Sequence, residues 1–160
     1  MHNTFFLESM NMRLEIETAT TKLLDRLFEI EKHSFQKEAF TKAEIAYLLT
    51  DYNAIGLAAR INGEVVGFAI GRIDAAMGIS YGHILTIEAL SSHRRKGIAE
   101  KLLTDLEALF KEKGAKESRL EVREDNAPAI SLYEKLGYKR VSKLERYYGE
   151  AHGLYLKKTL

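Results

Sequence analysis

The apolar pattern in the second half of the chain constrains the fold most, because it alternates between a strand period and a helix period. Residues 83–90 read HILTIEAL, a strand pattern, and the leucines that follow share one face of a helix that ends at Gly114. Residues 119–124, RLEVRE, predict another strand, and a second helical pattern begins at Asn126 and ends at Gly137. The order strand, helix, strand, helix predicts a domain that combines a sheet with helices.

The first half of the chain predicts one strand, two helices and a hairpin. Residues 12–18 alternate between apolar and charged side chains, as a strand with one solvated face does. Leucines at helical spacing follow, and residues 41–44, TKAE, form the capping-box pattern that begins a second helix. The dipeptide Asn62-Gly63 then separates the strand-like residues 54–61 from residues 64–73. Because both turn residues tolerate positive φ, this stretch predicts an antiparallel hairpin.

The length of 160 residues fits one domain. We expect residues 1–11 to form a flexible lead-in and residues 12–160 to form the single domain. The last two strands are predicted at residues 138–145 and 153–159, with Arg146–His152 as the tip between them.

Composition limits the chemistry and the partners of the chain. The 24 Lys and Arg residues nearly balance the 23 Asp and Glu residues, so no nucleic acid is required as a partner. The chain has no cysteine, which excludes a disulfide framework, a thiolate metal site and a cysteine nucleophile. Its histidines show no metal-ligand spacing, so no metal is expected. The apolar patch near the start is too short for a signal peptide or a membrane span, and we expect a cytoplasmic protein without membrane attachment.

The stretch His93–Leu103, HRRKGIAEKLL, gathers cations and a glycine where a predicted strand ends and a helix begins. A helix N-terminus offers unpaired N–H donors and about half a positive charge, and Gly97 lets a ligand approach the backbone. This combination favours phosphate binding. The motifs GxxxxGK[ST] and GxGxxG are absent, so a different phosphate-carrying ligand is needed. The other interpretation is a basic helix start that is simply solvated.

The motif Arg94–Ala99, RRKGIA, resembles the Q/R-x-x-G-x-G/A signature of the GNAT N-acetyltransferase superfamily. The stretch Leu120–Val141 resembles the branch of protein N-terminal acetyltransferases that contains ribosomal-protein alanine acetyltransferases and archaeal Ard1-like enzymes. Arg146-Tyr147-Tyr148 matches the aromatic hairpin tip of that branch. The resemblance implies an α/β (α+β) fold: a mixed, mostly antiparallel sheet of about seven strands with about four helices, splayed between the fourth and fifth predicted strands.

The resemblance also implies acetyl-CoA as cofactor. In the superfamily the pantetheine pairs with the fourth strand, which places it here against Ile87, Glu88 and Ala89. The pyrophosphate is expected at the glycine turn, formed by Arg94, Arg95, Lys96, Gly97, Ile98, Ala99 and Glu100. By the same resemblance Asn126 and Tyr133 complete the cofactor site from the next helix. Glu88 departs from the family pattern, because related enzymes commonly carry a small or apolar residue there.

The reaction that the resemblance implies is direct attack of an amine on the acetyl thioester. Glu121 is expected to accept the proton through a water, His83 to share this path, and Tyr133 to donate a proton to the departing thiolate. Each residue also has a structural interpretation: a carboxylate on the sheet surface, a hydrogen-bonded histidine at a strand end, and a tyrosine in the core. An α-amino group has a pKa near 7.7–8.0 and a lysine near 10.4, so a modest base suits a protein N-terminus.

Substrate contacts are expected from Phe35 and Glu38, between the first two helices, and from Tyr147 and Tyr148. The alternative roles are a hydrophobic rim for Phe35, a solvated charge for Glu38 and a hairpin cap for the tyrosines. The predicted function is acetylation of the N-terminal α-amine of proteins or peptides. A small-molecule amine or a lysine side chain as acceptor remains open, as does a non-catalytic CoA-binding subunit. Association with a ribosome or a second subunit is also open, and the chain is expected to be a monomer or a homodimer.

Overall fold

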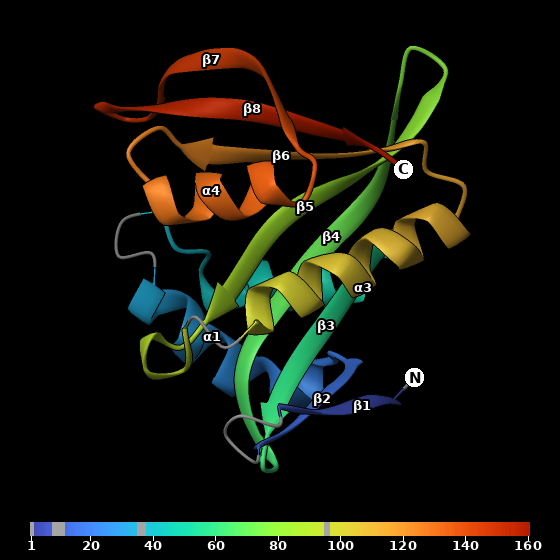
Figure 1. The fold of residues 1–160 in the computed structure, drawn as a ribbon, viewed down its shortest axis with the longest axis vertical. Coiled ribbons are helices and arrows are strands. Elements are labelled where there is room, and N and C mark those ends of the chain that lie inside the picture. The colour runs from blue at the N-terminus through green and yellow to red at the C-terminus, as the bar shows by residue number, and fades with distance from the viewer. Residues whose placement is uncertain (1, 8–11, 35–37, 95–96) are drawn as a thin grey trace. The chain divides into compact units, whose positions relative to one another are not determined.

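The computed structural model describes residues 2–7, 12–34, 38–94 and 97–160. The chain forms two compact units, the first made of Met1–Arg72 and Leu85–Leu106, the second of Ile73–Ile84 and Glu107–Leu160. The strands β4 (Glu64–Ala76) and β5 (Ile79–Ala89) and the helix α3 (Ile98–Glu112) each run from one unit into the other. Figure 1 shows the elements in chain order from blue to red.

The strands of the first unit follow one another in the sheet as they do in the sequence, from β1 to β5. β1 (His2–Leu7), β2 (Met12–Thr18), β3 (Ala54–Ile61) and β4 pair antiparallel. The predicted hairpin is confirmed, because Asn62 and Gly63 connect β3 to β4 with φ angles of 51° and 85°. Strand β1 lies within the residues that the sequence analysis assigns to the lead-in, and its backbone pairs with the outer edge of β2.

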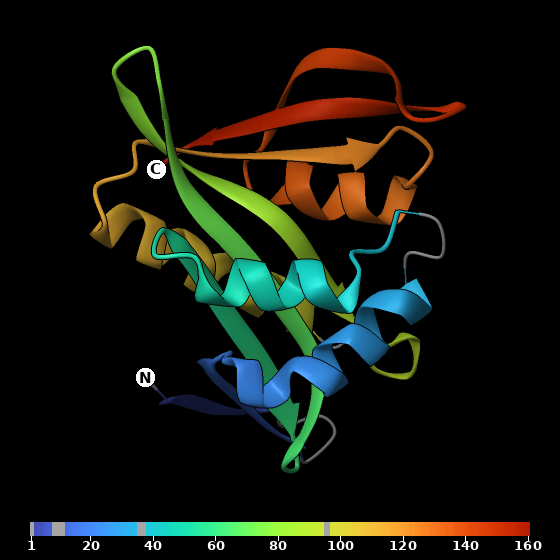
Figure 2. The same cartoon turned by 180° about the vertical axis from the view of Figure 1, so that it is seen from behind.

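Helices cover both faces of the sheet in the first unit. A short 3₁₀ turn (Thr21–Leu23) leads into α1 (Leu24–Ser34), and α2 (Lys42–Thr50) begins with the predicted capping box between Thr41 and Glu44. Figure 2 shows α1 and α2 on one face of β3 and β4, and Figure 1 shows the beginning of α3 on the other face. Buried side chains join α1 and α2 to the sheet: Leu27, Ile30, Ile45, Leu48, Ala58, Phe68 and Ile70.

The strands of the second unit have the order β5, β6 (Glu117–Arg123), β8 (Ala151–Thr159) and β7 (Lys139–Tyr148). β5 and β6 are parallel, and their paired residues run from Tyr81 with Glu117 to His83 with Arg119. β6 and β8 are antiparallel, as are the two strands of the β7–β8 hairpin, drawn in red in Figure 1. The helix α4 (Ala127–Lys135) has Asn126 as its N-cap.

A buried network of hydrogen bonds fixes β6 and β8 to the end of α3. The Tyr138 hydroxyl donates to Glu107 Oε2 over 2.7 Å and lies 2.7 Å from the Ser118 hydroxyl. The Lys158 ammonium donates to Glu107 Oε1 over 2.7 Å. Burial, together with the Glu107 charge, raises the pKa of Tyr138, so this hydroxyl stays protonated and continues to donate.

Several strands extend beyond their predicted residues: β4 ends at Ala76, β6 begins at Glu117 and β8 begins at Ala151. β5 begins at Ile79 and not at residue 83, because Met77 and Gly78 form a tight turn with positive φ that the apolar pattern does not reveal. β7 extends to Tyr148, so the tip is confined to Gly149 and Glu150 and is narrower than the predicted Arg146–His152. The register of β7 shifts between Leu144 and Tyr148, which interrupts the alternation in that stretch.

Candidate active site

A histidine and a glutamate meet on the parallel strands of the second unit. His83 Nε2 lies 2.7 Å from Glu121 Oε2 and 3.1 Å from Oε1. Glu121 occupies this place because Leu120 and Val122, on either side of it, point into the core. The two polar side chains are about one-fifth exposed, at 21% and 20%, so they are shielded but reachable from solvent.

A second carboxylate lies on the other side of the His83 ring. Asp74 Oδ2, at the end of β4, is 3.6 Å from His83 Nδ1. The imidazole therefore stands between two acidic side chains from neighbouring strands. A 2.7 Å contact between a ring nitrogen and a carboxylate oxygen requires one proton on either partner, so the pair can take up a proton and pass it on. The sequence analysis missed Asp74, because nothing in RIDAA marks it as a partner of a residue nine positions later.

Two tyrosines surround Glu121. Burial and the nearby Glu121 charge raise the pKa of Tyr147. Tyr155 is directly opposite Glu121 in the β6–β8 pairing, and burial raises its pKa while a hydrogen bond with Arg119 opposes the rise. The Tyr148 ring packs edge-on against Tyr147, with 4.9 Å between the ring centroids. The sequence analysis named Tyr147 and Tyr148 but missed Tyr155, although the alternation in GLYLKK places it on the face of Glu121.

The two site residues predicted on α4 have structural contacts. Tyr133 is 7% exposed and packs edge-on against Tyr138, with 5.9 Å between the ring centroids. Asn126 Oδ1 accepts a hydrogen bond of 3.3 Å from the Ala129 N–H and so caps the helix. The Tyr133 ring therefore packs in the core, which is the structural interpretation of this residue. The proton transfer expected of its hydroxyl stays a prediction.

The glycine turn of the first unit lies directly before helix α3. Gly97 has a φ of 76°, and a Cβ atom added to it would meet no atom of the described residues within 4 Å, its chain neighbours aside. Helix α3 begins directly after it at Ile98, whose side chain is buried. The N–H groups of a first helical turn have no partner within the helix and attract anions. The predicted residues Arg95 and Lys96 lie outside the described residues, as does Phe35.

The last residues of β5 lie close to the backbone of β4. A Cβ atom on Gly67 would lie 2.6 Å from the Glu88 carbonyl oxygen, so only glycine permits this approach. The Leu90 N–H donates a hydrogen bond of 2.8 Å to the Val66 carbonyl, so the contact between the two backbones continues one residue beyond the end of β5. The Glu88 side chain is buried and hydrogen-bonded to Ser34, the last residue of α1. Ile87 and Ala89 flank it on β5.

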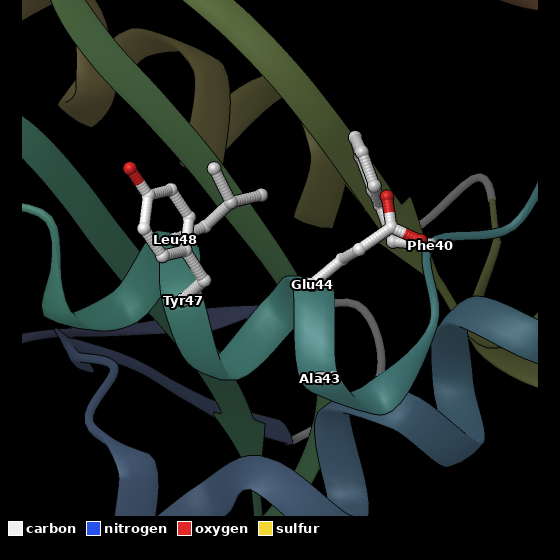
Figure 3. Close-up of a pocket in the computed structure, with 5 residues that line it drawn as sticks. All are labelled: Phe40, Ala43, Glu44, Tyr47 and Leu48. Atoms are coloured by element: carbon white, nitrogen blue, oxygen red, sulfur yellow. The ribbon is translucent and has the colours of Figure 1, made fainter.

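An open depression of about 280 Å³ lies along α2, and Figure 3 shows the side chains of Phe40, Tyr47 and Leu48 around it. Its carboxylate, Glu44, accepts a hydrogen bond from the Thr41 N–H as part of the capping box. Glu38 precedes this region and is partly exposed.

In the part of the chain that the structure describes, no group of three or more His, Asp or Glu side chains is placed to hold a metal ion. Within the same ranges no helix is long and apolar enough to cross a membrane.

The chain is similar to several known proteins. The chain is 38% identical to an N-alpha-acetyltransferase of Sulfurisphaera tokodaii over 117 residues, which cover 68% of this chain and 70% of that protein. It is 31% identical to an N-alpha-acetyltransferase of Sulfolobus acidocaldarius over 151 residues, 89% of each chain. The structure of Ard1 from Thermoplasma volcanium superposes with a TM-score of 0.83 at 25% identity and covers 92% of this chain and 97% of that one.

The likeness to Ard1 confirms the predicted α/β fold with its mixed sheet, four helices and a parallel pair at the fourth and fifth predicted strands, here β5 and β6. The sequence profile of the acetyltransferase (GNAT) family matches residues 21–138, which is more than half of the chain. The predicted class of enzyme, an acetyltransferase, is confirmed with it. The chain therefore belongs to the acetyltransferase (GNAT) family.

Proposed function

We propose that this protein transfers the acetyl group of acetyl-CoA to the N-terminal α-amine of a protein or peptide by direct attack. The observation that carries the proposal is the contact between His83 and Glu121, which provides a partly shielded proton acceptor on adjacent strands. The N-alpha-acetyltransferases of the two archaeal relatives support the choice of acceptor. The absence of cysteine fits a reaction without an acyl-cysteine intermediate.

The proton chemistry follows from the geometry of the pair. An attacking amine must be neutral, and it loses a proton as the new bond to the acetyl carbon forms. Glu121 accepts this proton through a water, and His83 shares it through the 2.7 Å contact. Asp74 lies on the far side of the ring, with its Oδ2 3.6 Å from His83 Nδ1. Because freeing a lysine at pH 7 costs about 3 kcal/mol more than freeing an α-amine, this modest base suits an N-terminus.

The residues present fit the cofactor. No described residue beyond its chain neighbours crowds Gly97, which suits a phosphate against the first turn of α3, and Arg94 adds positive charge before it. When bound, acetyl-CoA supplies the activated thioester. The backbone of Ile87, Glu88 and Ala89 would hold its pantetheine, and residues 94–100 its pyrophosphate. Asn126 and Tyr133 would complete the site, with the Tyr133 hydroxyl protonating the thiolate that leaves.

The acceptor is tested with a peptide panel and mass spectrometry. Each peptide carries one internal lysine and is supplied with a free and with a blocked N-terminus. We expect acetylation of the free N-terminus and none of the blocked form. Modification of the lysine alone, or faster turnover of a free polyamine, aminoglycoside or amino acid than of every peptide, would contradict the proposal. Binding of CoA without turnover of any amine would indicate a non-catalytic subunit.

The cofactor cradle is tested with Gly97→Val. We expect the dissociation constant for CoA, measured by calorimetry, to rise about 10-fold or more, because a β-branched side chain fills the open space and strains a left-handed backbone. Gly78→Val is the matched control, since Gly78 also has positive φ and open surroundings but lies in the turn between β4 and β5. Equal affinities of the two variants would show that the turn at Gly97 does not bind the pyrophosphate.

A further inference from the structure

A buried carboxylate ties together three segments of the first unit. Glu31, on α1, is 1% exposed. Its Oε2 accepts a hydrogen bond of 3.1 Å from the Phe40 N–H, just before α2 begins, and its Oε1 accepts one of 2.8 Å from the Thr86 hydroxyl on β5. Both oxygens accept, so the arrangement suits the ionised form of Glu31. The residue thus fixes the chain that enters α2 to strand β5.

A second buried carboxyl group holds the other end of the same connection. Glu88 lies two residues beyond Thr86 on β5 and is 7% exposed. The hydroxyl of Ser34, which ends α1, donates a hydrogen bond to it. Ser34 ends α1 and Phe40 lies two residues before α2, so they flank the predicted substrate residues Phe35 and Glu38. Each end is therefore hydrogen-bonded to a buried carboxyl group.

Burial acts on the pKa of both carboxyl groups. Burial raises the pKa of Glu88 to about 8, and the Glu31 charge adds to the rise while Arg94 and the Ser34 bond oppose it. Burial also raises the pKa of Glu31, against its bonds from Phe40 and Thr86, and the Glu44 charge acts in the same direction as burial. Glu88 is therefore mostly protonated at pH 7. Above pH 8 the ionisation of Glu88 adds a negative charge to the cluster.

Such a pair is costly to bury, and apolar residues of similar volume would stabilise the fold as well or better. Its contacts point to a role in placing the connection. We propose that Glu31 and Glu88 are positioning residues for the acceptor peptide, which hold Ser34 and Phe40 on β5 only while the pair carries a single negative charge. The inference rests on the proposed function, since it assumes a peptide acceptor.

The first test compares the wild type with Glu88→Gln, whose amide cannot ionise. If the peptide binds only the singly charged pair, its apparent KM rises by the inverse of the protonated fraction of Glu88. With a pKa of about 8, the ratio of the wild-type KM to that of Glu88→Gln increases about 10-fold between pH 7 and pH 9. Because both enzymes meet the same peptide at each pH, the titration of the peptide amine cancels in the ratio of the two KM values. The corresponding ratio of kcat is expected to change with pH by less than 2-fold.

The second test removes the other anchor. Glu31→Gln replaces one accepting oxygen by a donor, and we expect the KM for the peptide to rise about 5-fold or more at pH 7 while kcat changes less than 2-fold. If this variant does not fold, Thr86→Val removes the hydroxyl donor while preserving the side-chain shape, and the same split is expected at about 3-fold. Glu29→Gln, on the exposed face of α1, is the control and leaves both constants unchanged.

The outcomes separate this inference from the proposed function. If peptides are acetylated but the KM ratio does not change with pH, or kcat changes in its place, only the positioning role is wrong. If no peptide is acetylated at all, the proposed function fails and the inference fails with it.

Thermal unfolding gives an independent check on the charge of Glu88. Because the pKa of Glu88 is raised in the folded chain, its contribution to stability is complete below about pH 4.5 and is lost as the pH rises through about 8. The melting temperature of the wild type should therefore fall relative to Glu88→Gln over this range, and parallel curves would overturn the inference.

Discussion

Glu121→Gln is expected to lower kcat for a peptide N-terminus about 100- to 1,000-fold at pH 7, with little change in the affinity for CoA. General-base catalysis contributes about 10²- to 10⁴-fold, and an amide oxygen cannot accept the proton that the amine releases. The substitution also removes the negative charge that faces His83 over 2.7 Å. Steady-state kinetics with one peptide, together with calorimetry for CoA, measures both effects. The deficit should become smaller at high pH, where more of the amine is already neutral.

Glu117→Gln is the matched control for this prediction. Glu117 lies on the same strand and the same face as Glu121, but its carboxylate pairs with Arg119 over 2.9 Å and has no contact with His83 in the described structure. We expect it to retain at least one-third of the wild-type kcat. If Glu121→Gln were equally active, the pair of His83 and Glu121 would be a structural ion pair, and the catalytic assignment would have to be abandoned.

Gly82→Ala is expected to destabilise the protein by about 3 kcal/mol or more. An added Cβ atom would lie 2.0 Å from Cδ2 of Phe110, which is fully buried, so either the ring or strand β5 must move. A loss of this size corresponds to a fall of roughly 8 °C in melting temperature for a chain of this length. Because Gly82 precedes His83, we also expect kcat to fall at temperatures where the variant is still folded. Thermal unfolding and peptide kinetics on the same preparation check both results.

Phe110→Leu supplies the control for the steric origin of this effect. On its own it opens a cavity and lowers stability. In the Gly82→Ala background the smaller side chain makes room for the new methyl group, so the double variant should be more stable than the sum of the two single changes predicts. Additive losses would show that the overlap with Phe110 is not what requires glycine at position 82.

Local features of the sequence predict the elements of this fold because their causes are local. Asn62 and Gly63 form the expected hairpin because few residue pairs tolerate two positive φ angles in succession. Thr41 and Glu44 form the capping box because each side chain reaches the backbone of the other within one turn. Alternation along β6 correctly places Glu121 on the face opposite Leu120 and Val122. The extension of β7 to Tyr148 is not predictable in this way, because a register shift against β8 breaks the alternation.

The sequence by itself therefore determined the order of strands and helices, the glycine turn before α3 and, through family resemblance, the residues His83 and Glu121. Only the tertiary structure decided which groups these residues face. Asp74 reaches His83 because strands β4 and β5 are neighbours, Tyr155 reaches Glu121 because of the register between β6 and β8, and Glu31 reaches Thr86 because α1 packs on the sheet. Contacts of this kind depend on register and packing between distant segments, and the apolar periodicity of a single segment predicts neither.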